Sequence, residues 1–123
     1  MTLLEKIKGR QARVGVLGLG YVGLPLAVEK AKAGFRVLGF DIQEDKVARV
    51  NRGENYIGDV VDEELTRLVA SGHIEASSDF DRLRECDVVA ICVPTPLDRY
   101  KQPDLSYVTN SGREVAARLH PGM

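Results

Sequence analysis

The 123-residue sequence contains no tryptophan, only two cysteines and only 6% aromatic residues. The cysteines, Cys86 and Cys92, do not form a CxxC pair, which excludes the usual spacing of zinc and redox sites, and we interpret both as reduced structural thiols. The two histidines, His73 and His120, each follow a predicted helix, and no Ser/His/Asp arrangement or pair of carboxylates stands out. The sequence therefore predicts no metal site and no catalytic residue.

The chain also lacks an excess of charge of one sign. It has 17 basic and 18 acidic residues without a long block of either, which argues against the basic surface of a nucleic-acid or membrane-surface binder. No apolar run approaches the roughly 20 residues of a membrane span, and residues 1–10 lack the features of a signal peptide. We expect a cytoplasmic protein that binds neither nucleic acid nor membrane.

Short apolar runs alternate with segments of helical spacing along the whole chain. The runs predict strands over residues 12–17, 35–40, 74–76 and 87–93. The helical spacing predicts a lead-in helix within residues 1–11 and further helices over 21–33, 43–51, 61–71 and 78–84, with a last one from Asp104 or Ser106. This alternation implies right-handed crossovers and an α/β fold, a Rossmann-like doubly wound parallel sheet in a three-layer α/β/α arrangement. We expect one domain over residues 1–123, truncated on its C-terminal side.

Several residues are predicted to shape the helix ends. Gly34 supplies the left-handed stop after the helix over 21–33, and Ser77 or Ser78 is expected to cap the helix over 78–84. The last helix is expected to carry the apolar positions Val108, Val115, Ala116 and Leu119.

A glycine-rich turn lies between the first strand and the next helix. Its residues are Gly18, Leu19, Gly20, Tyr21, Val22 and Gly23, in GxGxxG spacing. The first glycine permits a tight turn, the second leaves room for a pyrophosphate, and the third lets helix and strand pack closely. Amides at the start of the helix and the positive end of its dipole favour a negative group there. The alternative is a turn with a purely structural role.

An acidic residue strengthens the first interpretation. Asp41 follows the second strand, 18 residues beyond Gly23, near the spacing at which a carboxylate accepts hydrogen bonds from the ribose of a dinucleotide. A carboxylate repels the 2'-phosphate of NADP, and no arginine directly follows it, so the pattern favours NAD. The alternative is a solvated residue at the end of a strand.

Two further contacts with the cofactor are predicted. Lys46 lies early in the helix over 43–51 and can reach the adenosine or a phosphate, unless it is simply an exposed helical lysine. Pro94 and Thr95 follow the fourth strand at its carboxyl end, where open parallel sheets bind their ligands, unless they only end the strand.

Four segments together resemble one enzyme family. GLGYVGLPLA over 18–27, GFDI over 39–42, CVPTPL over 92–97 and PDLSYV over 103–108 are similar to the N-terminal part of the UDP-glucose/UDP-N-acetylhexosamine 6-dehydrogenases. The segment NYIGD over 55–59 and the long stretch over 95–108 are closer to the UDP-N-acetylglucosamine and UDP-N-acetylmannosamine branch.

The resemblance implies an NAD-dependent oxidation of a sugar C6 hydroxyl to a carboxylate, in polysaccharide biosynthesis, with a cysteine nucleophile. It assigns cofactor roles to residues 18–23, Asp41, Lys46 and Thr95 of this chain. The catalytic residues, the central helix through which such enzymes pair and the UDP-sugar domain are expected only in a full-length protein, so the fragment alone is expected to be inactive. Two alternatives remain, a stand-alone NAD(H)-sensing module and another NAD-dependent dehydrogenase.

Overall fold

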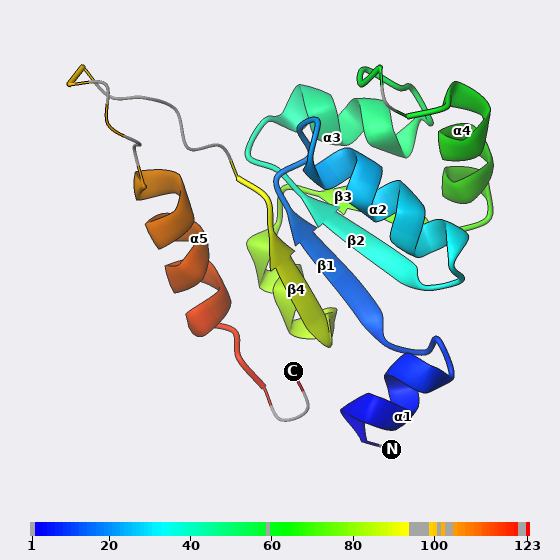
Figure 1. Ribbon diagram of the computed structural model, residues 1–123, viewed down its shortest axis with the longest axis horizontal. Coiled ribbons are helices and arrows are strands. Elements are labelled where there is room, and N and C mark those ends of the chain that lie inside the picture. The colour runs from blue at the N-terminus through cyan, green and yellow to red at the C-terminus, as the bar shows by residue number, and fades with distance from the viewer. Residues whose placement is uncertain (1, 59, 94–98, 101, 103–104, 121–122) are drawn as a thin grey trace.

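A computed structural model describes residues 2–58, 60–93, 99–100, 102, 105–120 and 123. Its elements are α1 (Leu3–Lys8), β1 (Arg13–Leu17), α2 (Gly23–Lys32), β2 (Arg36–Phe40), α3 (Glu44–Asn51), α4 (Asp62–Ala70), β3 (Ile74–Ser77), the 3-10 helix η1 (Phe80–Glu85), β4 (Val88–Ile91) and α5 (Ser106–Ala116). Their order confirms the alternation predicted from the sequence (Figure 1). No helix among the described residues is long and apolar enough to span a membrane.

The strands form one parallel sheet in the order β3-β2-β1-β4. The chain moves outward from β1 through β2 to β3 and then returns to the other side of β1, so the strand order reverses between β1 and β4. In the register of the sheet, Leu17 of β1 pairs with Phe40 of β2 and Ile91 of β4. The carboxyl ends of these three strands therefore meet at one edge, at the switch point where doubly wound sheets bind ligands.

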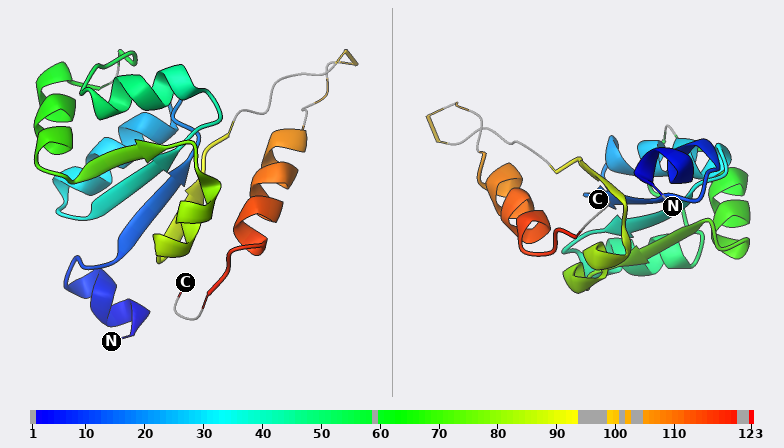
Figure 2. Two further views of the ribbon diagram at one scale, coloured as in Figure 1. Left: turned by 180° about the vertical axis from the view of Figure 1, so that it is seen from behind. Right: turned by 90° about the horizontal axis from the view of Figure 1, so that it is seen from below.

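Each face of the sheet has its own apolar core, because successive side chains of a strand point to opposite faces. Val14 and Val16 of β1 belong to a core that α2, α3 and α4 cover. Leu17 and Phe40 belong to a second core that η1 covers and that a residue of α5 joins (Figure 2). This confirms the predicted three-layer α/β/α fold.

The helix ends agree with the sequence in one case and differ in another. Gly34 adopts φ +102° after α2, as predicted. The cap of η1 was predicted wrongly, because the N-cap is Asp79, whose side chain accepts a hydrogen bond from the Asp81 amide. The Ser77 hydroxyl instead accepts from the Asp79 amide at 3.0 Å, since Ser77 still belongs to β3.

Helix α5 lies along β4 at the border of the sheet and buries little of its apolar surface (Figure 1). It begins at Ser106, while Asp104 lies outside the described residues. Val115 packs against the second core, but Val108 and Leu119 are 39% and 64% exposed. The apolar positions of the predicted helix therefore do not all face the core, because α5 contacts mainly one strand.

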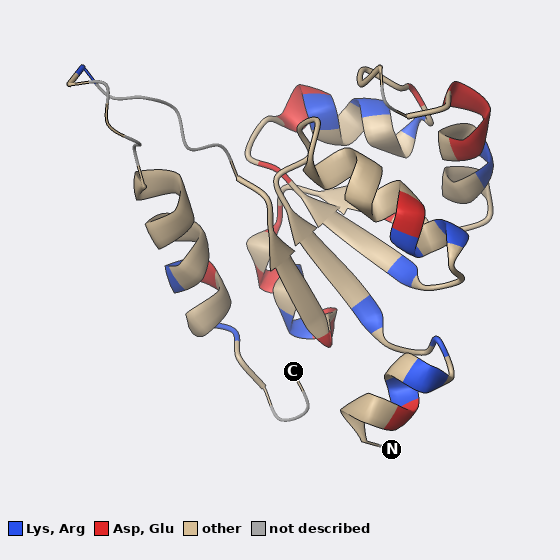
Figure 3. Cartoon of the chain, in the orientation of Figure 1, with Lys and Arg blue, Asp and Glu red and all other residues tan. Residues whose placement is uncertain are grey.

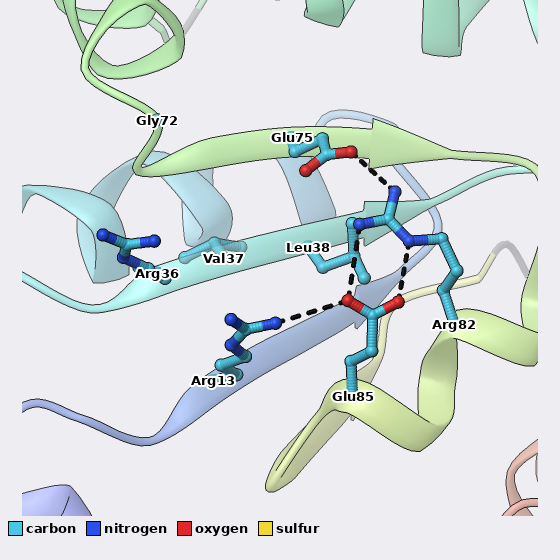
Figure 4. A pocket seen from close by; sticks show the side chains of 8 residues that line it. All are labelled: Arg13, Arg36, Val37, Leu38, Gly72, Glu75, Arg82 and Glu85. Atoms are coloured by element: carbon cyan, nitrogen blue, oxygen red, sulfur yellow. Dashed lines mark hydrogen bonds and ion pairs between the residues drawn. The ribbon is translucent and has the colours of Figure 1, made fainter.

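Charged side chains gather at the amino end of the sheet. Strands β1 and β2 each begin with an arginine, Arg13 and Arg36, which are paired in register (Figure 3). Arg82 of η1 forms ion pairs with Glu75 of β3 at 2.6 Å and with Glu85 at 2.9 Å, and Arg13 pairs with Glu85 at 3.3 Å. These residues line a shallow pocket that the ion pairs cross (Figure 4).

A buried carboxylate joins the lead-in helix α1 to the amino end of the sheet. Asp87, just before β4, accepts a hydrogen bond from the Arg13 amide at 2.9 Å and pairs with the Lys6 ammonium of α1 at 3.0 Å. Burial works to raise the pKa of Asp87, but the Arg13 amide and the Lys6 ammonium outweigh burial and hold that pKa below its usual value. The lead-in helix is therefore part of the folded domain.

Candidate cofactor site

The first glycine of the turn allows β1 to end against β4. Gly18 adopts φ +94° and donates its amide to the Phe40 carbonyl at 2.8 Å. A Cβ atom at this position would lie 2.6 Å from the Cys92 carbonyl oxygen. Both the left-handed backbone and the close approach require glycine, as the sequence predicts.

The third glycine brings α2 onto the turn. A Cβ atom at Gly23 would overlap the Gly18 carbonyl oxygen and lie 3.3 Å from the Cys92 side chain. The start of α2 can therefore approach the end of β1 only with glycine here, which agrees with the predicted role in helix–strand packing.

The second glycine faces open space. A Cβ atom at Gly20 would meet nothing within 4 Å. The next two side chains, Tyr21 and Val22, are 77% and 61% exposed, and Val22, the N-cap of α2, makes no side-chain capping bond. The turn thus leaves a surface where a ligand can approach the backbone amides at the helix start, and these residues fit a dinucleotide pyrophosphate.

Leu19 is fixed between the turn and β2. Its side chain is 1% exposed and packs over Gly39, where a Cβ atom would lie 2.6 Å from Leu19 Cδ2. Its amide donates to Asp41 Oδ2 at 2.9 Å. Leu19 therefore shapes the turn through its side chain and its amide, and a direct contact with the cofactor stays a prediction.

Asp41 lies at the carboxyl end of β2, next to the glycine turn. Besides Leu19, it accepts a hydrogen bond from the Gln43 amide at 2.9 Å through its other oxygen. An ionised carboxylate has about four acceptor positions, so two backbone bonds leave capacity for ribose hydroxyls. The carboxylate is thus held in place at the switch point while it retains free acceptor sites.

A residue that the sequence did not mark as part of the site also contacts the turn. Tyr56, in the loop between α3 and α4, donates its hydroxyl to the Leu19 carbonyl at 2.6 Å. Burial, Asp41 and Asp45 raise the pKa of Tyr56 above its ordinary value, so the phenol remains a donor at neutral pH. The contact spans 37 positions of the sequence, and no local pattern points to it.

The remaining predicted cofactor contacts, Lys46, Pro94 and Thr95, stay predictions. Lys46 is partly exposed on α3. Pro94 and Thr95 lie outside the described residues. The chain immediately before them remains close to the turn, because the Cys92 amide donates to the Leu17 carbonyl at 2.7 Å.

Both cysteines are free thiols in apolar surroundings. Burial raises the pKa of Cys86 to about 11 and raises that of Cys92 as well, so both remain protonated at neutral pH. This agrees with the prediction of reduced structural thiols.

Comparison with known proteins identifies the domain. Residues 12–122 match the NAD binding domain of the UDP-glucose/GDP-mannose dehydrogenase family. The chain belongs to this family. The match covers the glycine turn, Asp41 and the strands that carry them, so the cofactor of this domain is NAD, as predicted.

Several members of this family are similar to the chain, and some of them are named as dehydrogenases of UDP-N-acetylhexosamines. A UDP-N-acetyl-D-glucosamine 6-dehydrogenase from Salmonella typhi is 34% identical over 91% of the chain, and a UDP-N-acetyl-D-mannosamine dehydrogenase from Pyrococcus horikoshii is 36% identical over 89%. The chain spans only 25% and 26% of these proteins. These relatives agree with the branch that the sequence indicates.

The crystal structure of an NDP-N-acetyl-D-galactosaminuronic acid dehydrogenase from Methanosarcina mazei has the same fold as the chain. The two structures superpose with a TM-score of 0.83 at 36% sequence identity. The match covers 100% of this chain and 29% of the Methanosarcina mazei chain. The family's Rossmann fold is therefore present in the chain.

Proposed function

We propose that the chain is the cofactor-binding part of an NAD-dependent UDP-N-acetylhexosamine 6-dehydrogenase and has no dehydrogenase activity by itself. The observation that carries this proposal is the glycine turn, where Gly18 and Gly23 bring strand and helix together and Gly20 stays open beside Asp41. N-acetylhexosamine dehydrogenases among the relatives support the choice of substrate.

In this proposal, the backbone amides of residues 20–23 bind the NAD pyrophosphate at the start of α2. Asp41 accepts hydrogen bonds from the adenosine ribose and disfavours the 2'-phosphate of NADP. Lys46 from α3, with Pro94 and Thr95 after β4, adds contacts along the cofactor. NAD, when bound, supplies the acceptor for the hydride that leaves the sugar C6 carbon.

The remaining parts of the enzyme are assigned to a full-length protein. The nucleophilic cysteine, the UDP-sugar domain and the central helix of a dimer are proposed to lie outside this chain. A cytoplasmic location and a role in polysaccharide biosynthesis are predictions that follow from the same assignment.

Two experiments on purified protein test the proposal. Titration calorimetry should show that the 123-residue chain binds NAD and discriminates against NADP. Incubation with NAD and either UDP-N-acetylglucosamine or UDP-N-acetylmannosamine should yield no NADH from the chain but should yield NADH from a full-length protein that contains it. Turnover by the chain alone would contradict the proposal that the catalytic residues lie outside it. Failure to bind NAD would contradict the proposed cofactor role.

A further inference from the structure

The carbonyl group between the first two glycines of the turn has a dedicated partner. Tyr56 donates its hydroxyl to the Leu19 oxygen across 2.6 Å, the short end of the range for hydrogen bonds between oxygen atoms. On the other side of the same residue, the Leu19 amide is held by Asp41 at 2.9 Å. Both backbone groups of Leu19 are therefore fixed by residues from outside the turn.

The direction of one carbonyl sets the direction of the next amide. The Leu19–Gly20 peptide is trans, and in a trans peptide the C=O and N–H bonds point in opposite directions. When Tyr56 holds the Leu19 oxygen, the Gly20 N–H points away from Tyr56, and a Cβ atom at Gly20 would meet nothing within 4 Å. The same orientation keeps the partial negative charge of the carbonyl away from an anion on that side.

The loop that carries Tyr56 is itself held in place. Asn55 donates its side-chain amide to the Val60 carbonyl at 2.6 Å and accepts from the Ile57 amide at 2.8 Å. Val60 is buried in the core that α2 also joins, and Ile57 packs against it. Tyr56 packs against the same core, so its ring and hydroxyl are held in place by the protein itself.

We propose that Tyr56 is a positioning residue for NAD binding, which holds the Leu19–Gly20 peptide so that the Gly20 amide is presented to the pyrophosphate. This inference rests on the proposed role of the glycine turn in cofactor binding. Tyr56 acts through Leu19 and is not placed in contact with the cofactor.

The substitution Tyr56→Phe tests the inference because it removes the hydroxyl and keeps the ring in the core. We expect NAD to bind about three- to tenfold more weakly, the loss expected for one hydrogen bond. Adenosine, which has no pyrophosphate, should bind with unchanged affinity in an NMR titration. The matched control is Tyr107→Phe, at a half-exposed tyrosine of α5, which should leave both affinities unchanged.

A second measurement separates positioning from a general structural role. The 15N order parameter of the Gly20 amide in the free chain should fall in Tyr56→Phe and stay constant in Tyr107→Phe. NAD affinity within twofold of the wild type, or an unchanged Gly20 order parameter, would overturn the inference. If the wild-type chain does not bind NAD, the proposed function fails, whereas the Gly20 measurement still decides whether Tyr56 holds the turn.

Discussion

The two ends of the parallel sheet are built from different chemistry. At the carboxyl end, glycines, backbone amides and one carboxylate leave an exposed surface around Gly20. At the amino end, Arg13, Arg82 and Asp87 pair with other charged residues or with the backbone. The same strands therefore present polar backbone to a ligand at one end and form ion pairs at the other.

This difference separates binding from stability. A near-neutral chain can bind a cofactor with two phosphates because peptide dipoles at a helix start supply the attraction. The ion pairs at the amino end join α1, η1 and the strands, so they contribute to the fold rather than to the site. Substitutions of charged side chains at the two ends should therefore have separable effects on NAD affinity and on the free energy of unfolding, whereas Gly18 and Gly23 hold the backbone of the binding end together.

The largest effect is expected for Gly23→Ala, which breaks the packing of the binding end. A Cβ atom there overlaps the Gly18 carbonyl, so α2 must move away from β1, at an expected loss of about 3 kcal/mol or more in unfolding free energy. Urea denaturation measures this loss. Gly112→Ala in α5 is the control, since a Cβ there meets nothing within 4 Å, and it should stabilise the chain by about 0.5 kcal/mol. Equal stability of the two variants would contradict the packing argument.

The next effect concerns affinity. Asp41→Asn removes the charge that holds the Leu19 amide and that is proposed to bind the ribose. Loss of hydrogen bonds to a charged group should weaken NAD binding about 30- to 100-fold and reduce the preference for NAD over NADP. Calorimetric titrations with both dinucleotides measure this change. An unchanged NAD to NADP ratio would argue against Asp41 as the ribose ligand.

A substitution at the amino end of the sheet should lower stability and leave NAD affinity unchanged. Asp87→Asn removes the buried negative charge that pairs with the Lys6 ammonium and accepts the Arg13 amide. We expect a loss of about 2 kcal/mol in unfolding free energy, with NAD affinity unchanged. A matching fall in NAD affinity, measured at a temperature where the variant is folded, would show that the two ends are coupled.

The stability of the wild type should depend on pH through the same residue. The pKa of Asp87 is lowered in the folded chain, so its contribution is complete above the unfolded value of about 3.9 and is lost as the pH falls through the lower folded value. Urea denaturation below pH 4 should show a steeper loss for the wild type than for Asp87→Asn. Parallel curves would contradict this assignment.

The smallest effect is expected for Arg82→Gln. Its ion pairs with Glu75 and Glu85 are largely exposed to solvent, which screens them. The loss should be below about 1 kcal/mol at low salt and should shrink at high salt, with no change in NAD affinity. Denaturation at two ionic strengths measures this difference, and a loss independent of salt would point to packing instead of charge.

Local patterns predict much of this molecule. The strands, the order of elements and the packing roles of Gly18 and Gly23 depend on residues close together in the chain, and the structure bears them out. The pyrophosphate contact at Gly20 stays a prediction. The contact of Tyr56 with Leu19 and the pairing of Lys6 with Asp87 join distant segments, so no spacing in the sequence reveals them. The same limit explains the wrong cap of η1, which depends on where β3 ends.

An NMR titration of the 15N-labelled chain with NAD tests the central claim most directly, because it reports on both ends of the sheet at once. The account predicts that NAD changes the chemical shifts most at the amides of residues 18–23 and 41. The amides of Arg13, Arg82 and Glu85 should change little. Changes centred on the amino end, or no saturable change at the glycine turn, would contradict it.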